Sequence, residues 1–206
     1  MNTLMLYIPT LLLFLVLAAF AWMKYAAFRK TRRTLQQARR GDPAAQYQAA
    51  LLYYQGRQVK KDWAQAFSYM HVAATGGHVP ALNGLGALYC AGHGTNKDEQ
   101  QAFTCYSEAA QKGNFEGMIN LAVMFHRGMG TNKDDSQAFA WLQKAADAGS
   151  PLGQRMLAEF YYAGIGTEID KQTGLKYYAQ AASQGEPTAV QFLKTRDPRL
   201  QHHGPM

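Results

Sequence analysis

Residues 85–98 read LGALYCAGHGTNKD, and the main positions of this stretch recur along the chain at an interval of 36 residues. The same interval relates four turn glycines, four aspartates, four alanine pairs and four later glycines: Gly56, Gly92, Gly128 and Gly164; Asp62, Asp98, Asp134 and Asp170; Ala73-Ala74, Ala109-Ala110, Ala145-Ala146 and Ala181-Ala182; Gly77, Gly113, Gly149 and Gly185. A repeat of this size cannot bury its apolar face alone, so neighbouring copies stack into a solenoid. The sequence therefore predicts an all-α solenoid whose four helix-turn-helix repeats cover about residues 43–78, 79–114, 115–150 and 151–186.

Each repeat is predicted to hold two helices joined by a glycine-rich turn. In the second copy, Leu85, Leu88 and Tyr89 have the spacing of one helical face. Turn glycines tolerate positive φ, and Asp98 suits the N-cap of the following helix. We expect first helices at about 43–55, 79–91, 115–127 and 151–163, second helices at about 62–76, 98–112, 134–148 and 170–184, and a capping helix at 187–196.

The pattern L-G-x-L-Y-x-x-G-x-G-T-x-x-D, followed by an aromatic-bearing helix and K/Q-A-A-x-x-G, resembles the Sel1-like repeat family over about residues 43–185. The first copy departs most from it, because Gln58 replaces the second turn glycine and Ala49 replaces a stripe leucine. The resemblance implies a right-handed solenoid, related to tetratricopeptide proteins, whose first helices line the inner face. It also implies a non-catalytic adaptor in bacterial envelope, secretion or signalling processes.

The N-terminal region is apolar and then basic. Leu4–Met23 is a run of 20 residues without a charged side chain. At 1.5 Å per residue such a helix spans about 30 Å, the thickness of a bilayer core. We predict an uncleaved transmembrane anchor at 1–23 in a bacterial inner membrane, a basic juxtamembrane helix at 24–41 and a cytoplasmic solenoid at 42–196. The alternative is a signal peptide cleaved after Ala19-Phe20-Ala21, which would place the repeats in the periplasm.

The charge distribution argues against nucleic-acid binding. The chain of 206 residues has a formal net charge of +7, and residues 1–41 hold seven basic residues and no acidic one. The remaining residues are balanced, whereas a nucleic-acid reader carries its basic excess on the folded domain. Cys90 and Cys105 are predicted to stay unpaired, since their offset within one repeat does not suit a disulfide. The tail 197–206 is predicted to be disordered.

The predicted site is a groove that docks a protein or peptide. Positions just off the buried stripe of the first helices mix aromatic, aliphatic and charged groups, as expected of a docking surface. The alternative is that several of them pack against a neighbouring repeat. The candidates, in repeat order, are Tyr47, Leu51 and Tyr54; Asn83; Ile119, Val123, His126 and Arg127; Arg155, Glu159 and Tyr162.

The sequence gives little sign of catalysis. It has no histidine or cysteine spacing typical of a metal site, no nucleophile elbow and no phosphate loop. The recurring aspartates are explained as helix caps. We therefore predict a membrane-anchored scaffold with no cofactor, metal or small-molecule substrate. The alternatives are a periplasmic accessory protein that assists envelope or secretion-system assembly, and an enzyme with an unrecognised site.

Overall fold

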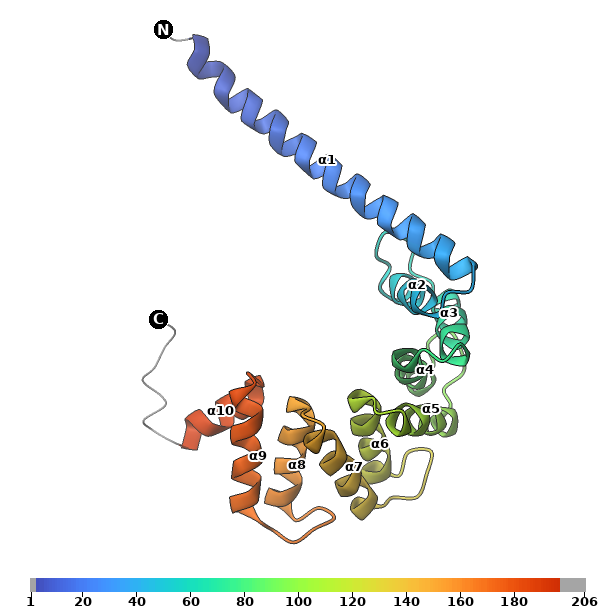
Figure 1. Ribbon diagram of the computed structural model, residues 1–206, viewed down its shortest axis with the longest axis vertical. Helices are drawn as coiled ribbons and strands as arrows, with labels where there is room; N and C mark the ends of the chain where they lie inside the picture. Colours follow the sequence, from blue (N-terminus) through green and yellow to red (C-terminus); the bar gives the residue numbers. More distant parts are fainter. Residues whose placement is uncertain (1–2, 197–206) are drawn as a thin grey trace. The chain divides into compact units, whose positions relative to one another are not determined.

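The computed structural model describes the backbone of residues 3–196 and the side chains of residue 13 and residues 15–196. The described chain is helical throughout, without a strand (Figure 1). The predicted disordered tail lies outside the described residues. The helices are α1 (Thr3–Arg39), α2 (Pro43–Gln55), α3 (Trp63–Thr75), α4 (Val79–Ala91), α5 (Glu99–Gln111), α6 (Phe115–Arg127), α7 (Asp135–Asp147), α8 (Pro151–Ala163), α9 (Lys171–Ser183) and α10 (Pro187–Arg196).

The repeats consist of the predicted helix pairs. The first helices α2, α4, α6 and α8 have the predicted bounds, and each second helix begins one residue after its expected start. The reason is that the recurring aspartate is an N-cap and stays outside the helix. The Asp98 carboxylate accepts a hydrogen bond from the Gln101 backbone N–H at 2.9 Å, which satisfies a donor that the first helical turn leaves free.

Small side chains let each second helix pack closely on the next first helix. Ala145 and Ala146 are buried on α7, and a Cβ built on Gly153 of α8 would lie 2.9 Å from the Ala145 Cβ. At the preceding junction, a Cβ on Gly117 would lie 2.7 Å from the Ala109 Cβ. The paired alanines of the sequence pattern are therefore the contact points between consecutive repeats.

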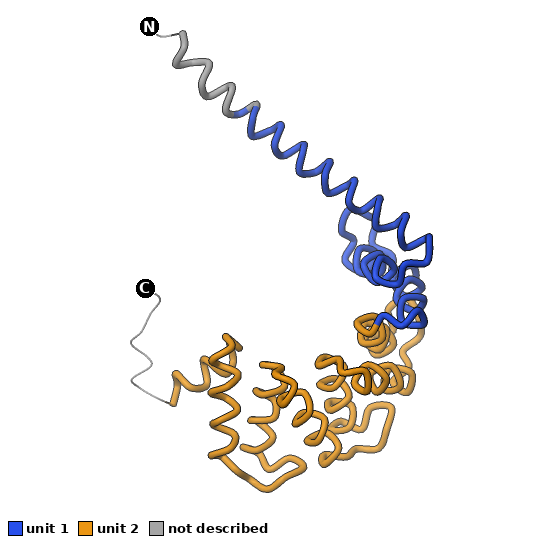
Figure 2. Tube along the Cα trace, viewed as in Figure 1, with its two compact units in different colours: residues 1–78 blue, residues 79–206 orange. Residues whose placement is uncertain are grey.

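The chain divides into two compact units, residues 1–78 with α1 to α3 and residues 79–206 with α4 to α10 (Figure 2). The core of the second unit is centred on four fully buried side chains: Leu121, Met124, Leu142 and Leu157. The helix α10 packs on a second, smaller cluster of this unit, in which Ala189 is buried and the Phe192 ring stacks on Tyr178 at a centroid distance of 3.8 Å. It thus caps the last repeat, as the sequence predicted.

The C-terminal end of α1 is built like a second helix of a repeat. The Gly41 N–H donates to the Ala38 carbonyl at 3.1 Å with a φ of 91°, and the Gly185 N–H donates to the Ala182 carbonyl at 2.9 Å with a φ of 83°. The Gln46 side chain donates to the same Ala38 carbonyl at 3.3 Å. The last turns of α1 are therefore a half-repeat that covers the first full repeat.

The predicted anchor falls partly outside the description, since the side chains of residues 4–12 and 14 are not described. Among the described residues, no helix combines the length and the apolar character that crossing a bilayer requires.

Candidate functional site

Ten of the eleven predicted groove residues occupy three rows on the first helices, and Arg127 lies one position after the last row. One row is engaged in packing. Tyr47 stacks on His78 at a centroid distance of 4.7 Å. Asn83 accepts a hydrogen bond from the Asn120 side-chain amide at 2.8 Å, so it links α4 to α6. Ile119 is buried in the core of the second unit. These positions support the packing alternative, and the buried side chain of Ile119 is not accessible to a partner.

Arg155 completes this row and is also mainly structural. Its side chain is only 18% exposed and forms ion pairs with Glu159 on its own helix and with Glu186. Glu186 in turn accepts a hydrogen bond from the Ala189 backbone N–H in the first turn of α10. The Arg155 guanidinium thus fastens α8 to the capping helix, while Glu159 keeps a partly exposed carboxylate.

Another row contains His126 and Tyr162, which have partners within the chain. His126 Nδ1 lies 2.6 Å from Asp135 Oδ1, and Lys133 Nζ lies 3.3 Å from Asp135 Oδ2. The hydrogen bond with His126 is the main reason why the pKa of the Asp135 carboxyl is lowered. Tyr162 packs edge-on against Phe192 of the capping helix. His126 is therefore positioned by a residue of its own repeat, and Tyr162 by the capping helix.

The remaining predicted residues keep accessible side chains. Tyr54 and Arg127 are exposed, and Leu51 and Val123 are half-buried. Tyr54 and Leu51 belong to the first unit, and Arg127 and Val123 belong to the second. Among the predicted groove residues, these four keep side-chain surface that is accessible from outside the chain.

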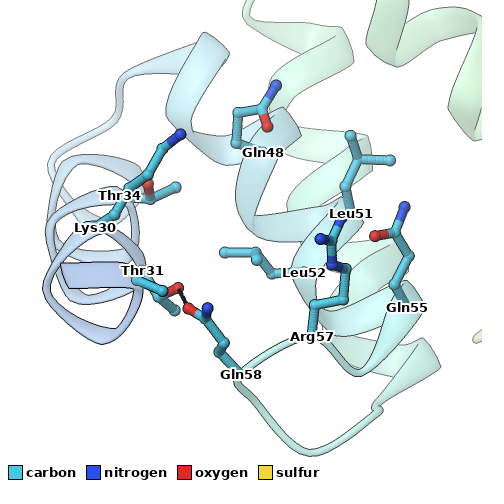
Figure 3. A pocket seen from close by; sticks show the side chains of 10 residues that line it. Lys30, Thr31, Thr34, Gln48, Leu51, Leu52, Gln55, Arg57 and Gln58 are labelled. Atoms are coloured by element: carbon cyan, nitrogen blue, oxygen red, sulfur yellow. Dashed lines mark hydrogen bonds between the residues drawn. The ribbon is translucent and has the colours of Figure 1, made fainter. Parts of the chain in front are cut away.

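The structure adds a cavity that the sequence analysis missed. It has a volume of about 370 Å³ and lies in the first unit between α1, α2 and the turn that follows α2 (Figure 3). Leu51 is a predicted site residue that lines it. Ala38 and Gly41 could have indicated this part of the structure, because they lie 36 residues before Ala74 and Gly77 and so continue the repeat pattern into α1. That pattern identifies the end of α1 as a wall against which the first repeat packs.

The turn residue Gln58 accounts for the opening of this cavity. In the fourth repeat its counterpart is Gly166, and a Cβ there would lie 2.1 Å from the Asp135 carbonyl oxygen. That turn therefore rests directly on the start of α7. Gln58 has a φ of 61° and a Cβ, which excludes the same close approach to α1. Its side-chain oxygen accepts a hydrogen bond from the Thr31 hydroxyl instead (Figure 3).

The cavity is suited to an anion. Lys30 of α1 and Arg57 of the turn line it, and its lining contains no carboxylate. Within the described part of the chain, neither cation takes part in an ion pair. The other polar lining groups are hydroxyls and amides, from Thr34 and Gln48 among others. Both kinds of group can donate hydrogen bonds to an oxyanion.

The described residues show no arrangement typical of a metal site or an activated thiol. No group of three His, Cys, Asp or Glu side chains within them could hold a metal ion. Cys90 and Cys105 are free, as predicted. Burial raises the pKa of the Cys105 thiol to about 11, so it stays protonated near neutral pH and is a weak nucleophile.

Comparison with known families identifies the repeats. The sequence model of the Sel1 repeat matches residues 43–78, 79–114, 115–150 and 151–186. The chain is a Sel1 repeat protein. Among curated proteins, no sequence matches it.

Solved structures include similar Sel1 repeat arrays. The protective antigen c5321 of uropathogenic Escherichia coli is 33% identical with a TM-score of 0.75, over 80% of this chain and 35% of that chain. A Sel1 repeat protein from Oxalobacter formigenes is 28% identical with a TM-score of 0.71, over 75% of this chain and 63% of that one. The immunity protein Pa5087 from Pseudomonas aeruginosa is 25% identical with a TM-score of 0.57, over 74% and 57%. The match thus spans between about one third and two thirds of each relative's length.

Proposed function

We propose that this Sel1 repeat protein is a membrane-anchored scaffold that docks a protein partner in a bacterial envelope, secretion or signalling assembly. The array of four Sel1 repeats carries this proposal, because Sel1 repeat proteins are generally interaction scaffolds. A relative named as an immunity protein supports a role in protein recognition. The repeats would form a right-handed solenoid whose first helices line the partner groove.

The anchor part of the proposal is supported by the N-terminal half of α1. Leu15, Val16 and Leu17 are consecutive residues and therefore point to different sides of the helix, yet all are more than half exposed. A helix that is apolar on all sides is stable in a bilayer but not in water. The basic residues after Met23 favour the orientation in which the repeats face the cytoplasm.

The orientation can be tested with reporters fused after Met206. A cytoplasmic solenoid should give a fluorescent protein fusion that is bright and an alkaline phosphatase fusion that is inactive. Extraction with alkaline carbonate should leave the protein in the membrane fraction. An active phosphatase fusion with a shortened N-terminus would instead establish the periplasmic alternative.

The partner surface can be tested with matched variants of the full chain in mild detergent. Tyr54→Ala together with Arg127→Ala removes two exposed groups from the first helices, and we expect it to release a specifically co-purifying protein. The control is Gln111→Ala with Lys112→Ala, which alters exposed residues at the end of a second helix. If both double variants retain the partner equally, the partner does not bind through the first-helix surface.

A further inference from the structure

The cavity between α1 and α2 has cations on two of its walls. Lys30 extends from α1 and Arg57 from the turn after α2, as Figure 3 shows. Gln48 and Gln55 contribute side-chain amides, and Leu51 contributes an apolar side. Two cations with hydrogen-bond donors around them match a phosphate group, because charge-assisted hydrogen bonds to phosphate oxygens are stronger than neutral ones. The leucine would face a less polar part of the same molecule.

The position of this cavity along α1 indicates where such a phosphate would come from. Trp22 and Tyr25 are exposed aromatic residues of the kind that mark a membrane–water boundary. The Lys24 ammonium lies 4.6 Å from the centre of the Phe20 ring, and the Arg29 guanidinium lies 5.9 Å from the centre of the Tyr25 ring. Positively charged side chains therefore begin on α1 at the same height as these aromatic residues. Lys30 follows Tyr25 by five residues, or about 7.5 Å of helix. This is about the depth of a lipid headgroup layer.

We propose that the cavity between α1 and α2 binds the headgroup phosphate of an anionic phospholipid. This inference rests on the membrane anchoring proposed above. The lipid would bridge α1 and the first repeat, with Lys30 and Arg57 as its phosphate ligands. Gln58 is the residue that keeps the site open, since the glycine at the corresponding position of the fourth repeat lies against the preceding helix.

The test uses the full chain reconstituted into phosphatidylcholine vesicles that contain increasing fractions of phosphatidylglycerol. Native mass spectrometry of the extracted protein measures which lipid remains bound. We expect the unmodified chain to retain phosphatidylglycerol preferentially, and Lys30→Gln with Arg57→Gln to weaken this retention about tenfold or more, as the loss of two charge-assisted contacts implies. Gln58→Gly, which lets the turn approach α1 without a change of charge, should also weaken it.

The matched control is Arg33→Gln with Lys60→Gln. Arg33 lies three residues after Lys30 on α1, and Lys60 lies three residues after Arg57 in the segment between α2 and α3. Neither Arg33 nor Lys60 lines the cavity, and the control lowers the net charge by the same amount as the test variant. We expect this variant to retain the anionic lipid like the unmodified chain. Circular dichroism and thermal unfolding should show that all variants fold alike.

The outcomes separate the inference from the proposed function. Equal losses in the test and control variants would mean a diffuse attraction to the surface and would overturn the site. Displacement of the lipid by inorganic phosphate, or by an acidic peptide, would overturn the assignment to a lipid. If the chain enters the vesicles without any lipid preference, the inference fails and the anchor stands. If it does not enter even pure phosphatidylcholine vesicles, the anchor fails and the lipid assignment fails with it.

Discussion

The junction between α1 and α2 and the junction between α7 and α8 have the same construction but a different turn beside them. In both, a buried glutamine of the first helix donates to an alanine carbonyl of the preceding helix: Gln46 to Ala38 at 3.3 Å and Gln154 to Ala146 at 3.4 Å. The fourth repeat then closes with Gly166, whereas the first repeat has Gln58. The comparison teaches that one turn residue decides whether a repeat seals against its neighbour or leaves a cavity.

The largest effect is expected from the turn glycine of the fourth repeat, Gly166. Gly166→Ala would place a Cβ 2.1 Å from the Asp135 carbonyl, and it should lower the free energy of unfolding by about 3–4 kcal/mol. Gly149 also has a positive φ, but nothing lies within 4 Å of its added Cβ, so Gly149→Ala should cost only about 1 kcal/mol. Guanidinium unfolding followed by circular dichroism measures both. Equal losses would show that the tight contact of the turn is unimportant.

The next effect concerns a position that is filled in one unit and open in the other. Leu142 is fully buried in the second unit, and its counterpart three repeats earlier, Thr34, is half-buried at the cavity. Leu142→Ala should lower the free energy of unfolding by about 3 kcal/mol. Thr34→Ala removes little packed volume and should change it by less than about 0.5 kcal/mol. A large loss for Thr34→Ala in the same denaturation assay would mean that α1 packs on the first repeat without a cavity.

A smaller pair of effects would sharpen the likeness of the two junctions. Gln46→Ala removes one buried hydrogen bond to a carbonyl and should cost about 1 kcal/mol of unfolding free energy. Gln154→Ala removes the matching bond and also the partly buried bond that Gln154 accepts from the Gln184 side chain at 2.8 Å, so it should cost slightly more. Thermal unfolding of the two variants, with exposed Gln111→Ala as the control, provides the comparison. A silent Gln46→Ala would contradict the view that the end of α1 is a half-repeat.

The smallest effect depends on pH and is confined to the second unit. Since the folded state lowers the pKa of Asp135, the His126–Asp135 contact stabilises the fold above the unfolded pKa of about 4, and this contribution is lost as the pH falls through the lower folded value. At neutral pH, Asp135→Asn should cost a few tenths of a kcal/mol, because the pair is about one-third exposed and screened. The corresponding residues of the first repeat are Tyr54 and Trp63, so Tyr54→Phe should show no such dependence. A constant difference between Asp135→Asn and the unmodified chain down to pH 2 would contradict this assignment.

The helices and caps could be predicted from the sequence because local rules determine them and four copies repeat them. Asp98 and its counterparts cap the second helices in the structure as the sequence indicated. The groove was harder to predict. A helical stripe shows which face is apolar, but it does not show that Ile119 is covered by core residues or that Arg155 reaches the residue before α10. Such contacts depend on how closely neighbouring repeats approach each other.

The half-repeat at the end of α1 escaped the sequence analysis for a different reason. Ala38 and Gly41 have the phase of the repeats, but the residues before them are apolar and basic and so conceal it. The effect of Gln58 was equally hidden. A departure from the pattern shows that a turn differs, but the space that it opens depends on the helix that lies opposite.

The uninterrupted course of α1 from Thr3 to Arg39 has a mechanical consequence. A continuous helix has no joint, so in the anchored protein proposed above its length would fix both the height of the first repeat above the bilayer and the direction in which that repeat faces. Adding one residue between Met23 and Lys30 would turn the first repeat by about 100° around the helix axis, whereas adding seven would restore its direction and raise it by about 10 Å. With the proposed anchor, the number of residues in α1 would therefore set the side from which the proposed partner reaches the first repeat.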